Sequence, residues 1–100
     1  MLKAAFIFVA EGADGKKDRS VVTTPAVELT TVGVVDYAEA VAVSKELVEG
    51  GVQAIELCGG FGHLGTAKIV EAVGDKAVVG VVRFDKHPGL GNQSGDNLYL

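Results

Sequence analysis

The chain has 100 residues, 48% of them hydrophobic and 22% charged, with 13 acidic and 9 basic side chains and a formal net charge of −4. This length and composition predict one ordinary globular domain over residues 1–100, and the lack of a basic stripe argues against nucleic acid as a partner. One cysteine cannot form an internal disulfide, and the apolar N-terminal run is too short to span a membrane. We therefore expect a cytoplasmic protein with neither membrane nor nucleic acid as partner.

Four segments have the composition of buried β-strands. Residues 4–10 form a continuous apolar run, and residues 26–34, 52–58 and 77–84 are rich in valine, isoleucine and other strand-forming residues. The polar connection over residues 11–25 is long enough for a parallel crossover, with a short helix predicted near its end. An antiparallel entry of the first strand is the alternative, and the sequence leaves it open.

Two amphipathic helices separate the later strands. Asp36 and Glu39 have the spacing of a capping box, which predicts a helix over residues 36–49 that a pair of glycines ends. Apolar side chains recur at helical spacing over residues 66–73 and predict a second, shorter helix. Residues 85–100 are rich in glycine and are predicted to form an irregular tail.

The alternation of strands and helices predicts the fold class. The segments "AVELTT" and "AIELCG" each begin a similar strand–helix unit, which favours right-handed βαβ crossovers. We predict a single small α/β domain with a four-stranded, mostly parallel sheet and two or three helices, a βαβαβ core plus an N-terminal strand. Two firm helices cannot cover both faces of four apolar strands, so we also predict a homodimer or a larger symmetric assembly.

Charged side chains near the strand ends are the first candidates for a site. Ligands of parallel α/β sheets bind beyond the carboxyl ends of the strands. Aligning "VEL", "IEL" and "VRF" puts Glu28, Glu56 and Arg83 at matching positions on one face of the sheet, with Asp85 just beyond the last strand. The pattern indicates either a charged binding site or a structural ion pair that fixes the strand register.

A glycine-rich loop between the third strand and the second helix is the next candidate. Glycines allow a ligand to approach the backbone closely, and the free N–H groups at a helix start attract anions. Gly59, Gly60, Phe61 and Gly62 are therefore candidate ligand-binding residues. A tight turn is the alternative explanation of these glycines.

Three side chains around this loop are candidates for catalysis. Cys58 and His63 could form a thiolate–imidazole pair, and Glu56 is the candidate acid or base. The alternative is that Cys58 serves as a small buried hydrophobe. The histidines and the cysteine lack the spacing of metal ligands, and the loop matches no phosphate-loop or dinucleotide motif, so we predict neither a metal nor a cofactor.

The segments "AFIFVAEGAD", "VELTTVGVVDYAEAVAVSKELVEGGVQAIELCGGFG" and "VGVVRFD" resemble a family of small bacterial proteins known only as a domain of unknown function. The densest motifs of the likeness are "ELCGGFG" and "VRFD", and the family brings no established activity. The segment "SKELVEGGVQAIEL" also resembles a strand–helix unit of the keto-deoxy-phosphogluconate aldolase type of barrel. That resemblance implies a role in proton transfer for Glu56, although a full barrel needs about 200 residues or more.

Two functions follow from these features. The first is the binding, and possible conversion, of a small anionic or phosphorylated metabolite that meets the glycine loop and Arg83 at the carboxyl ends of the strands. The second is a non-enzymatic module that associates with copies of itself, in which the charged side chains only stabilise the sheet.

Overall fold

The computed structural model describes residues 1–84 and 86–100. Its sheet consists of β1 (Leu2–Val9), β2 (Arg19–Thr23), β3 (Val27–Val34), β4 (Ala54–Leu57) and β5 (Val78–Val81). Its helices are α1 (Tyr37–Glu49), α2 (His63–Val73) and α3 (Asp96–Tyr99), with 3-10 turns η1 (Gly74–Lys76) and η2 (Pro88–Leu90). The predicted α/β class is confirmed, but the sheet has five strands and not four.

The strand order is β2-β3-β1-β4-β5, and all neighbours are parallel except β2 and β3. The mostly parallel sheet is therefore confirmed, and β1 enters it parallel to β3. The extra strand, β2, lies where a short helix was expected, and that expectation was wrong. Val21, Val22 and Thr23 are β-branched, which disfavours a helix and suits an edge strand.

The helix α1 begins at its predicted N-cap. The Asp36 side chain accepts a hydrogen bond from the Glu39 amide at 2.8 Å. The reciprocal bond of a capping box is absent from the described contacts, because the Glu39 carboxylate instead accepts from the amides of Val35 (2.8 Å) and Gly15 (3.1 Å). Glu39 therefore ties the connection between β1 and β2 to the start of α1.

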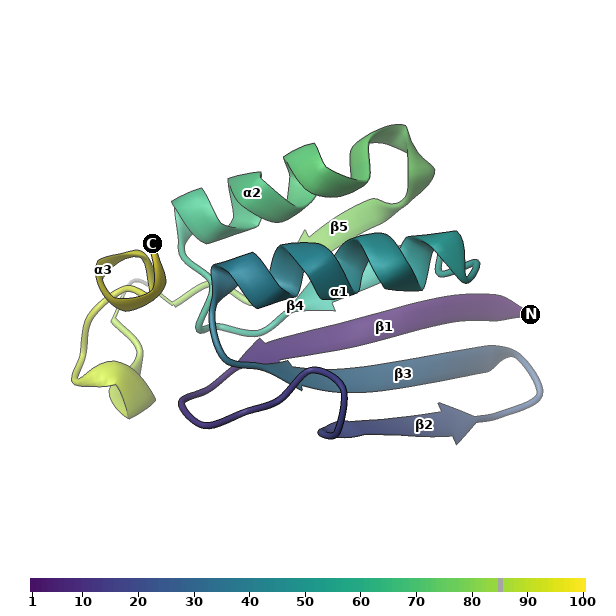
Figure 1. Cartoon of the computed structure of the whole chain (residues 1–100), viewed down its shortest axis with the longest axis horizontal. Helices are drawn as coiled ribbons and strands as arrows, with labels where there is room; N and C mark the ends of the chain where they lie inside the picture. The colour runs from purple at the N-terminus through teal and green to yellow at the C-terminus, as the bar shows by residue number, and fades with distance from the viewer. Residues whose placement is uncertain (85) are drawn as a thin grey trace.

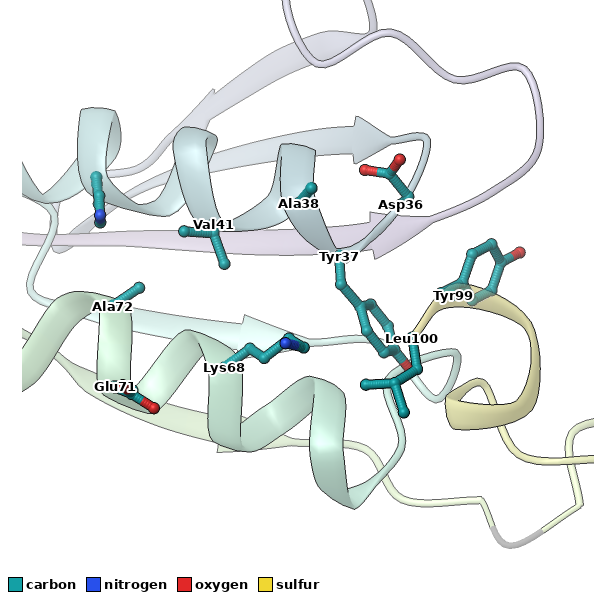
Figure 2. A pocket seen from close by; sticks show the side chains of 10 residues that line it. Asp36, Tyr37, Ala38, Val41, Lys68, Glu71, Ala72, Tyr99 and Leu100 are labelled. Carbon is teal, nitrogen blue, oxygen red and sulfur yellow. The ribbon is translucent and has the colours of Figure 1, made fainter.

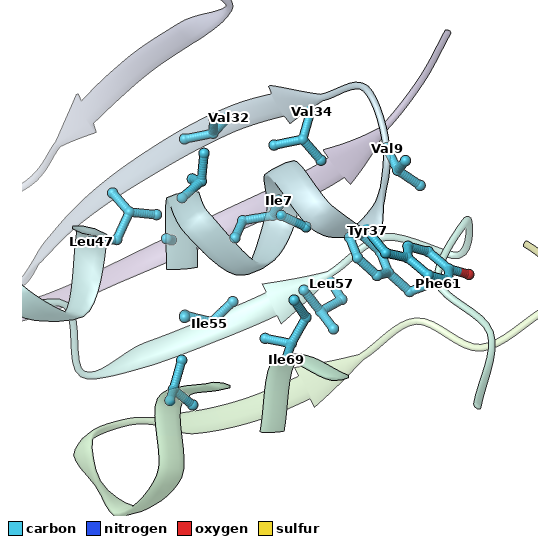
Figure 3. Close-up of a cluster of buried hydrophobic side chains, with 14 of the residues drawn as sticks. Ile7, Val9, Val32, Val34, Tyr37, Leu47, Ile55, Leu57, Phe61 and Ile69 are labelled. Carbon is cyan, nitrogen blue, oxygen red and sulfur yellow. The ribbon is translucent and has the colours of Figure 1, made fainter. Parts of the chain in front are cut away.

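The two long helices both lie on one face of the sheet (Figure 1). The core fills the space between this helix layer and the sheet, as Figure 3 shows. Ile7, Val32, Ile55 and Leu57 point into it from three strands and are fully buried. None of the described helices is long and apolar enough to cross a membrane.

The opposite face of the sheet has no helix on it (Figure 1). In β1 the side chains of Ala5, Ile7 and Val9 point to the helices and are buried, whereas Phe6 and Phe8 between them are only half-buried. We call this surface the open face. By strand alternation and register it consists of Leu2, Ala4, Phe6, Phe8, Ser20, Val22, Val27, Leu29, Thr31, Gly33, Ala54, Glu56, Val78 and Gly80.

Candidate functional site

The carboxyl ends of the four parallel strands meet at one edge of the sheet, which we call the carboxyl edge. Val9 pairs with Val34 there, and Leu57 pairs with Val81 further along the sheet. The glycine loop, the starts of α1 and α2, and the segment containing α3 gather beyond these residues (Figure 1). This is where a ligand was expected.

The side chain of Asp96 occupies the N-terminus of α2. Its Oδ2 accepts a hydrogen bond from the Leu64 amide at 2.9 Å, and its Oδ1 accepts one from the Gly65 amide at 3.1 Å. Free amides at a helix start bind carboxylates in this way. The anion that the loop geometry predicts is thus supplied by the chain itself.

The hydroxyl of Tyr37 connects the loop to this carboxylate. It accepts a hydrogen bond from the Gly62 amide at 3.0 Å and donates one to Asp96 Oδ1 at 3.1 Å, with the Gly60 carbonyl oxygen 3.3 Å away. Burial, together with the negative charge of Asp96, raises the pKa of Tyr37 to about 12. The phenol therefore stays protonated at neutral pH and can donate its hydrogen bond to Asp96.

The charge of Asp96 is stabilised where it lies. Partial burial alone would raise the pKa of this carboxyl. The amides of Leu64 and Gly65, the Tyr37 hydroxyl and the nearby positive charge of Arg83 outweigh burial, so the pKa of Asp96 is lower than its ordinary value. Asp96 is consequently ionised at neutral pH and holds α3 against α2.

Close packing explains why this region is rich in glycine. A Cβ atom on Gly62 would lie 2.2 Å from the Asp96 carboxyl group, and one on Gly65 would lie 2.4 Å from the Tyr37 ring. A Cβ atom on Gly95 would lie 1.7 Å from the carbonyl oxygen of Gly60. These three positions have room for a hydrogen atom only, because the segment after β5 packs on the loop at Gly62 and Gly95, and the Tyr37 ring of α1 packs on Gly65.

Aromatic rings fill the space around the rest of the glycine loop. Phe61 is fully buried and stacks on Tyr37, with ring centroids 5.3 Å apart. A Cβ atom on Gly59, the first of the predicted loop residues, would lie 2.0 Å from the Phe84 ring. The predicted ligand-binding positions Gly59 and Phe61 therefore face side chains of this chain.

Cys58 and His63 flank the glycine loop in the sequence. The Cys58 thiol accepts a hydrogen bond from the Gly60 amide at 3.3 Å, and His63 is exposed at the first turn of α2. Among the described residues no hydrogen bond joins Cys58 to His63. Their role as a catalytic pair stays a prediction without a supporting contact.

The alignment of Glu28 with Glu56 was wrong. Phe6 of β1 is level with both Glu56 and Thr31, so Glu28 lies three residues nearer the amino end of β3. An odd offset also turns Glu28 to the helix-facing side, whereas Glu56 is exposed on the open face. The acid or base role of Glu56 stays a prediction.

Arg83 follows the end of β5 and does not share a strand position with Glu56. Its Nη1 donates to the Phe84 carbonyl oxygen, and its charge acts on Asp96. Arg83 thus lies at the carboxyl edge, as predicted, but beside the chain's own carboxylate. Asp85 lies outside the described residues.

A groove runs between α1 and α2 on the outer surface of the helix layer (Figure 2). Its volume is about 640 Å³, and Val41 and Ala72 contribute apolar surface to it. Lys45 of α1 and Lys68 of α2 also line it, and neither forms an ion pair with another described residue. Tyr99 lines its end nearest the carboxyl edge.

A family model described as a family of unknown function (DUF6506) matches residues 2–97. The chain belongs to this family. The predicted resemblance to a family of unknown function is thereby confirmed. No curated protein and no solved structure matches the chain. Membership in DUF6506 brings no activity with it, and the function has to be argued from the geometry of the chain.

Two important residues were not found from the sequence. Asp96 lies in a segment predicted to be irregular, and no pattern there indicates that a carboxylate returns to a helix 31 or 32 residues earlier. Tyr37 lies at the start of the predicted helix over residues 36–49, and no role was predicted for its hydroxyl group. A signal did exist for the open face. In a run such as "AAFIFVA" both odd-numbered and even-numbered positions are apolar, so the strand presents apolar side chains to both faces of the sheet.

Proposed function

We propose that this chain is a non-enzymatic interaction module that associates with copies of itself through the open face. The observation that carries the proposal is the exposed apolar surface of a central sheet. Leu2, Val22 and Val78 are 43%, 58% and 69% exposed, and two phenylalanine side chains of β1 are only half-buried. Contiguous apolar surface of this extent marks interaction sites in proteins.

The size and charge of the open face fit a second copy. Five strands of four to eight residues, about 4.8 Å apart and about 3.3 Å long per residue, present about 500 Å². Two copies would therefore bury about 1,000 Å², which is the lower limit for a specific interface. Glu56 is the one ionisable side chain among the residues assigned to the open face, so a chain of net charge −4 meets its copy on a nearly neutral surface.

The oligomeric state tests this proposal. Sedimentation velocity of the wild type across micromolar concentrations is expected to show a dimer or a larger closed assembly. Leu29→Lys, which puts a charge on the open face, is expected to be a folded monomer. The matched control is Val70→Lys on the outer side of α2, where the valine is 49% exposed, and it should assemble like the wild type. A wild type that stays monomeric would contradict the proposal.

The proposal includes a bacterial source and a cytoplasmic location. The bacterial source follows from the family resemblance of the sequence. The free thiol of Cys58 supports the location, because a reducing compartment preserves unpaired cysteines. Alkylation of free thiols during cell lysis, followed by measurement of the modified fraction of Cys58, would test whether the thiol is reduced in the cell.

The groove between α1 and α2 favours a second candidate function, the binding of a small anionic metabolite. Two lysines without an ion-pair partner among the described residues line it together with Asp36 and Glu71, so a small molecule that carries an anionic group beside hydrogen-bond donors would suit it. A ligand at 100 times its dissociation constant stabilises a protein by about 2.7 kcal/mol. Thermal-shift screening of small carboxylates and phosphorylated sugars against wild type and Lys68→Gln tests this candidate, and a panel without a lysine-dependent shift rejects it.

A further inference from the structure

We infer that two copies pack open face to open face about a two-fold axis parallel to β1, so that Glu56 of each copy meets Thr31 of the other. This inference rests on the proposed self-association and adds the arrangement and the residues that specify it. It is argued from the strand register, which sorts the open face into transverse rows of side chains.

The first row has polar side chains on both sides of a central phenylalanine. The register places Ser20, Thr31, Phe6, Glu56 and Gly80 side by side on β2, β3, β1, β4 and β5. Rotation by 180° about an axis along β1 exchanges β3 with β4 and β2 with β5. Phe6 then meets its own copy, Glu56 lies opposite a threonine hydroxyl, and glycine lies opposite serine.

The second row has complementary sizes. It consists of Val22, Leu29, Ala4, Ala54 and Val78 in the same strand order. The same rotation places Leu29 opposite the small Ala54 and Val22 opposite Val78, while Ala4 meets its own copy at the axis. Large side chains opposite small ones allow two sheets to pack at the usual separation of about 10 Å.

The carboxylate of Glu56 decides between this arrangement and its main alternative. A two-fold axis that runs across the strands, between the two rows, would place Glu56 opposite Ala54. A carboxylate buried against a methyl group loses its hydration without gaining a hydrogen bond, and that is costly. Opposite Thr31 it accepts a hydrogen bond from the hydroxyl group, so the axis along β1 is favoured.

Gly33 of the neighbouring strand explains how Phe8, which lies beyond the first row, can be near the axis. A Cβ atom on Gly33 would lie 2.6 Å from the Phe8 ring, so the ring lies across the glycine of the neighbouring strand. The ring is thus laid flat on the sheet and does not stand upright from it. This leaves space above β1 for the equivalent side chain of the second copy.

A pair of charge variants tests the arrangement. Thr31→Glu places a carboxylate opposite the partner's Glu56, and we expect the dissociation constant of the dimer to rise by at least about tenfold. Glu56→Lys alone places an ammonium group opposite Thr31 and should change dimerisation little. When the two variants are mixed, the new carboxylate of one copy meets the new ammonium group of the other. In an equal mixture random pairing makes about half of all dimers heterodimers, so native mass spectrometry should detect a heterodimer share well above about one half.

The mixture is informative because the attraction arises only between different chains. Circular dichroism of each variant verifies its fold, and Thr31→Lys serves as a second test, since it should bind the partner's Glu56 and leave the dimer at least as tight as the wild type. If the wild type dimerises but Thr31→Glu dimerises equally well and the mixture shows no heterodimer preference, this arrangement is wrong and the proposed function stands. If the wild type is monomeric, the proposed function fails and the arrangement fails with it.

Discussion

The carboxyl edge and the open face differ in whether other groups of the same chain already contact them. At the carboxyl edge the free amides of α2 already have an anion, because Asp96 accepts from Leu64 and Gly65. On the open face the apolar side chains of β1, β2 and β3 have no helix over them (Figure 1). The polar feature that resembles a ligand site is therefore closed within the chain, and the apolar feature is left exposed.

This difference separates stability from assembly. Substitutions at the carboxyl edge remove intrachain contacts and should lower the free energy of unfolding without changing the packing of the open face. Substitutions such as Leu29→Lys and Thr31→Glu change a surface that the isolated chain leaves exposed, and should act on association. Because association itself adds to apparent stability, unfolding measurements have to be made at one protein concentration.

The largest effect at the carboxyl edge is expected for Gly95→Ala. The new Cβ atom would lie 1.7 Å from the Gly60 carbonyl oxygen, a backbone atom that cannot rotate away as a side chain can, so the segment containing α3 has to move away. We expect a loss of about 2–3 kcal/mol in the free energy of unfolding, measured by urea denaturation. The control Gly50→Ala, whose Cβ would meet its nearest neighbour at 3.4 Å, should change it by less than about 0.5 kcal/mol. Equal effects of the two variants would show that Gly95 is not tightly packed.

A smaller effect is expected for Tyr37→Phe, which leaves the ring and removes the hydroxyl group. The amide of Gly62 then loses its acceptor in a buried place, which costs about 1–2 kcal/mol. The pKa of Tyr37 is raised from 10.0 to about 12, so its contribution is complete below pH 10 and is lost as the pH rises towards 12. The free energy of unfolding of the variant should therefore fall less steeply between those pH values.

Tyr99→Phe is the matched comparison for that measurement. Burial also raises the pKa of Tyr99, but its hydroxyl group forms none of the bonds to the glycine loop that Tyr37 forms. This variant should flatten the alkaline slope slightly and keep the Gly62 amide bonded. A Tyr37→Phe variant as stable as the wild type at neutral pH would mean that the hydroxyl group does not hold the loop.

Most of the fold could be predicted because its signals are local. The capping residue Asp36, the apolar periodicity of both long helices and the runs of β-branched residues each indicate their element within a few positions. The parallel direction of the strands could also be predicted, because strand–helix–strand units form right-handed crossovers between parallel strands. β2 was missed because a short edge strand that follows charged residues carries a weak pattern, and its pairing with β3 depends on a turn at residues 24–26.

The site was predicted less well because its signals are not local. The strings "VEL" and "IEL" look equivalent, but the register aligns Glu56 with Thr31, three positions beyond Glu28. Register is set by packing over the whole sheet, and three residues of slip change both the level and the face of a side chain. The glycine loop did indicate an anion at the start of α2, yet the sequence could not indicate that Asp96 provides it.

The smallest effect is expected for Asp96→Asn, and it shows most clearly in acid. The lowered pKa of Asp96 means that the folded chain binds this proton less readily than the unfolded chain. Its contribution is therefore present above the ordinary carboxyl pKa and is lost as the pH falls through the folded value. At pH 7 the variant should lose about 1 kcal/mol, which is typical of a lost helix cap, and the difference from wild type should shrink as the pH falls below the ordinary carboxyl pKa of 3.8. Asp75→Asn is the control, since that exposed carboxylate accepts no hydrogen bond from a described residue, and it should follow the wild type at every pH. A constant difference across the acid range would mean that Asp96 acts through its shape, and the carboxyl edge would then be closed by packing and not by charge.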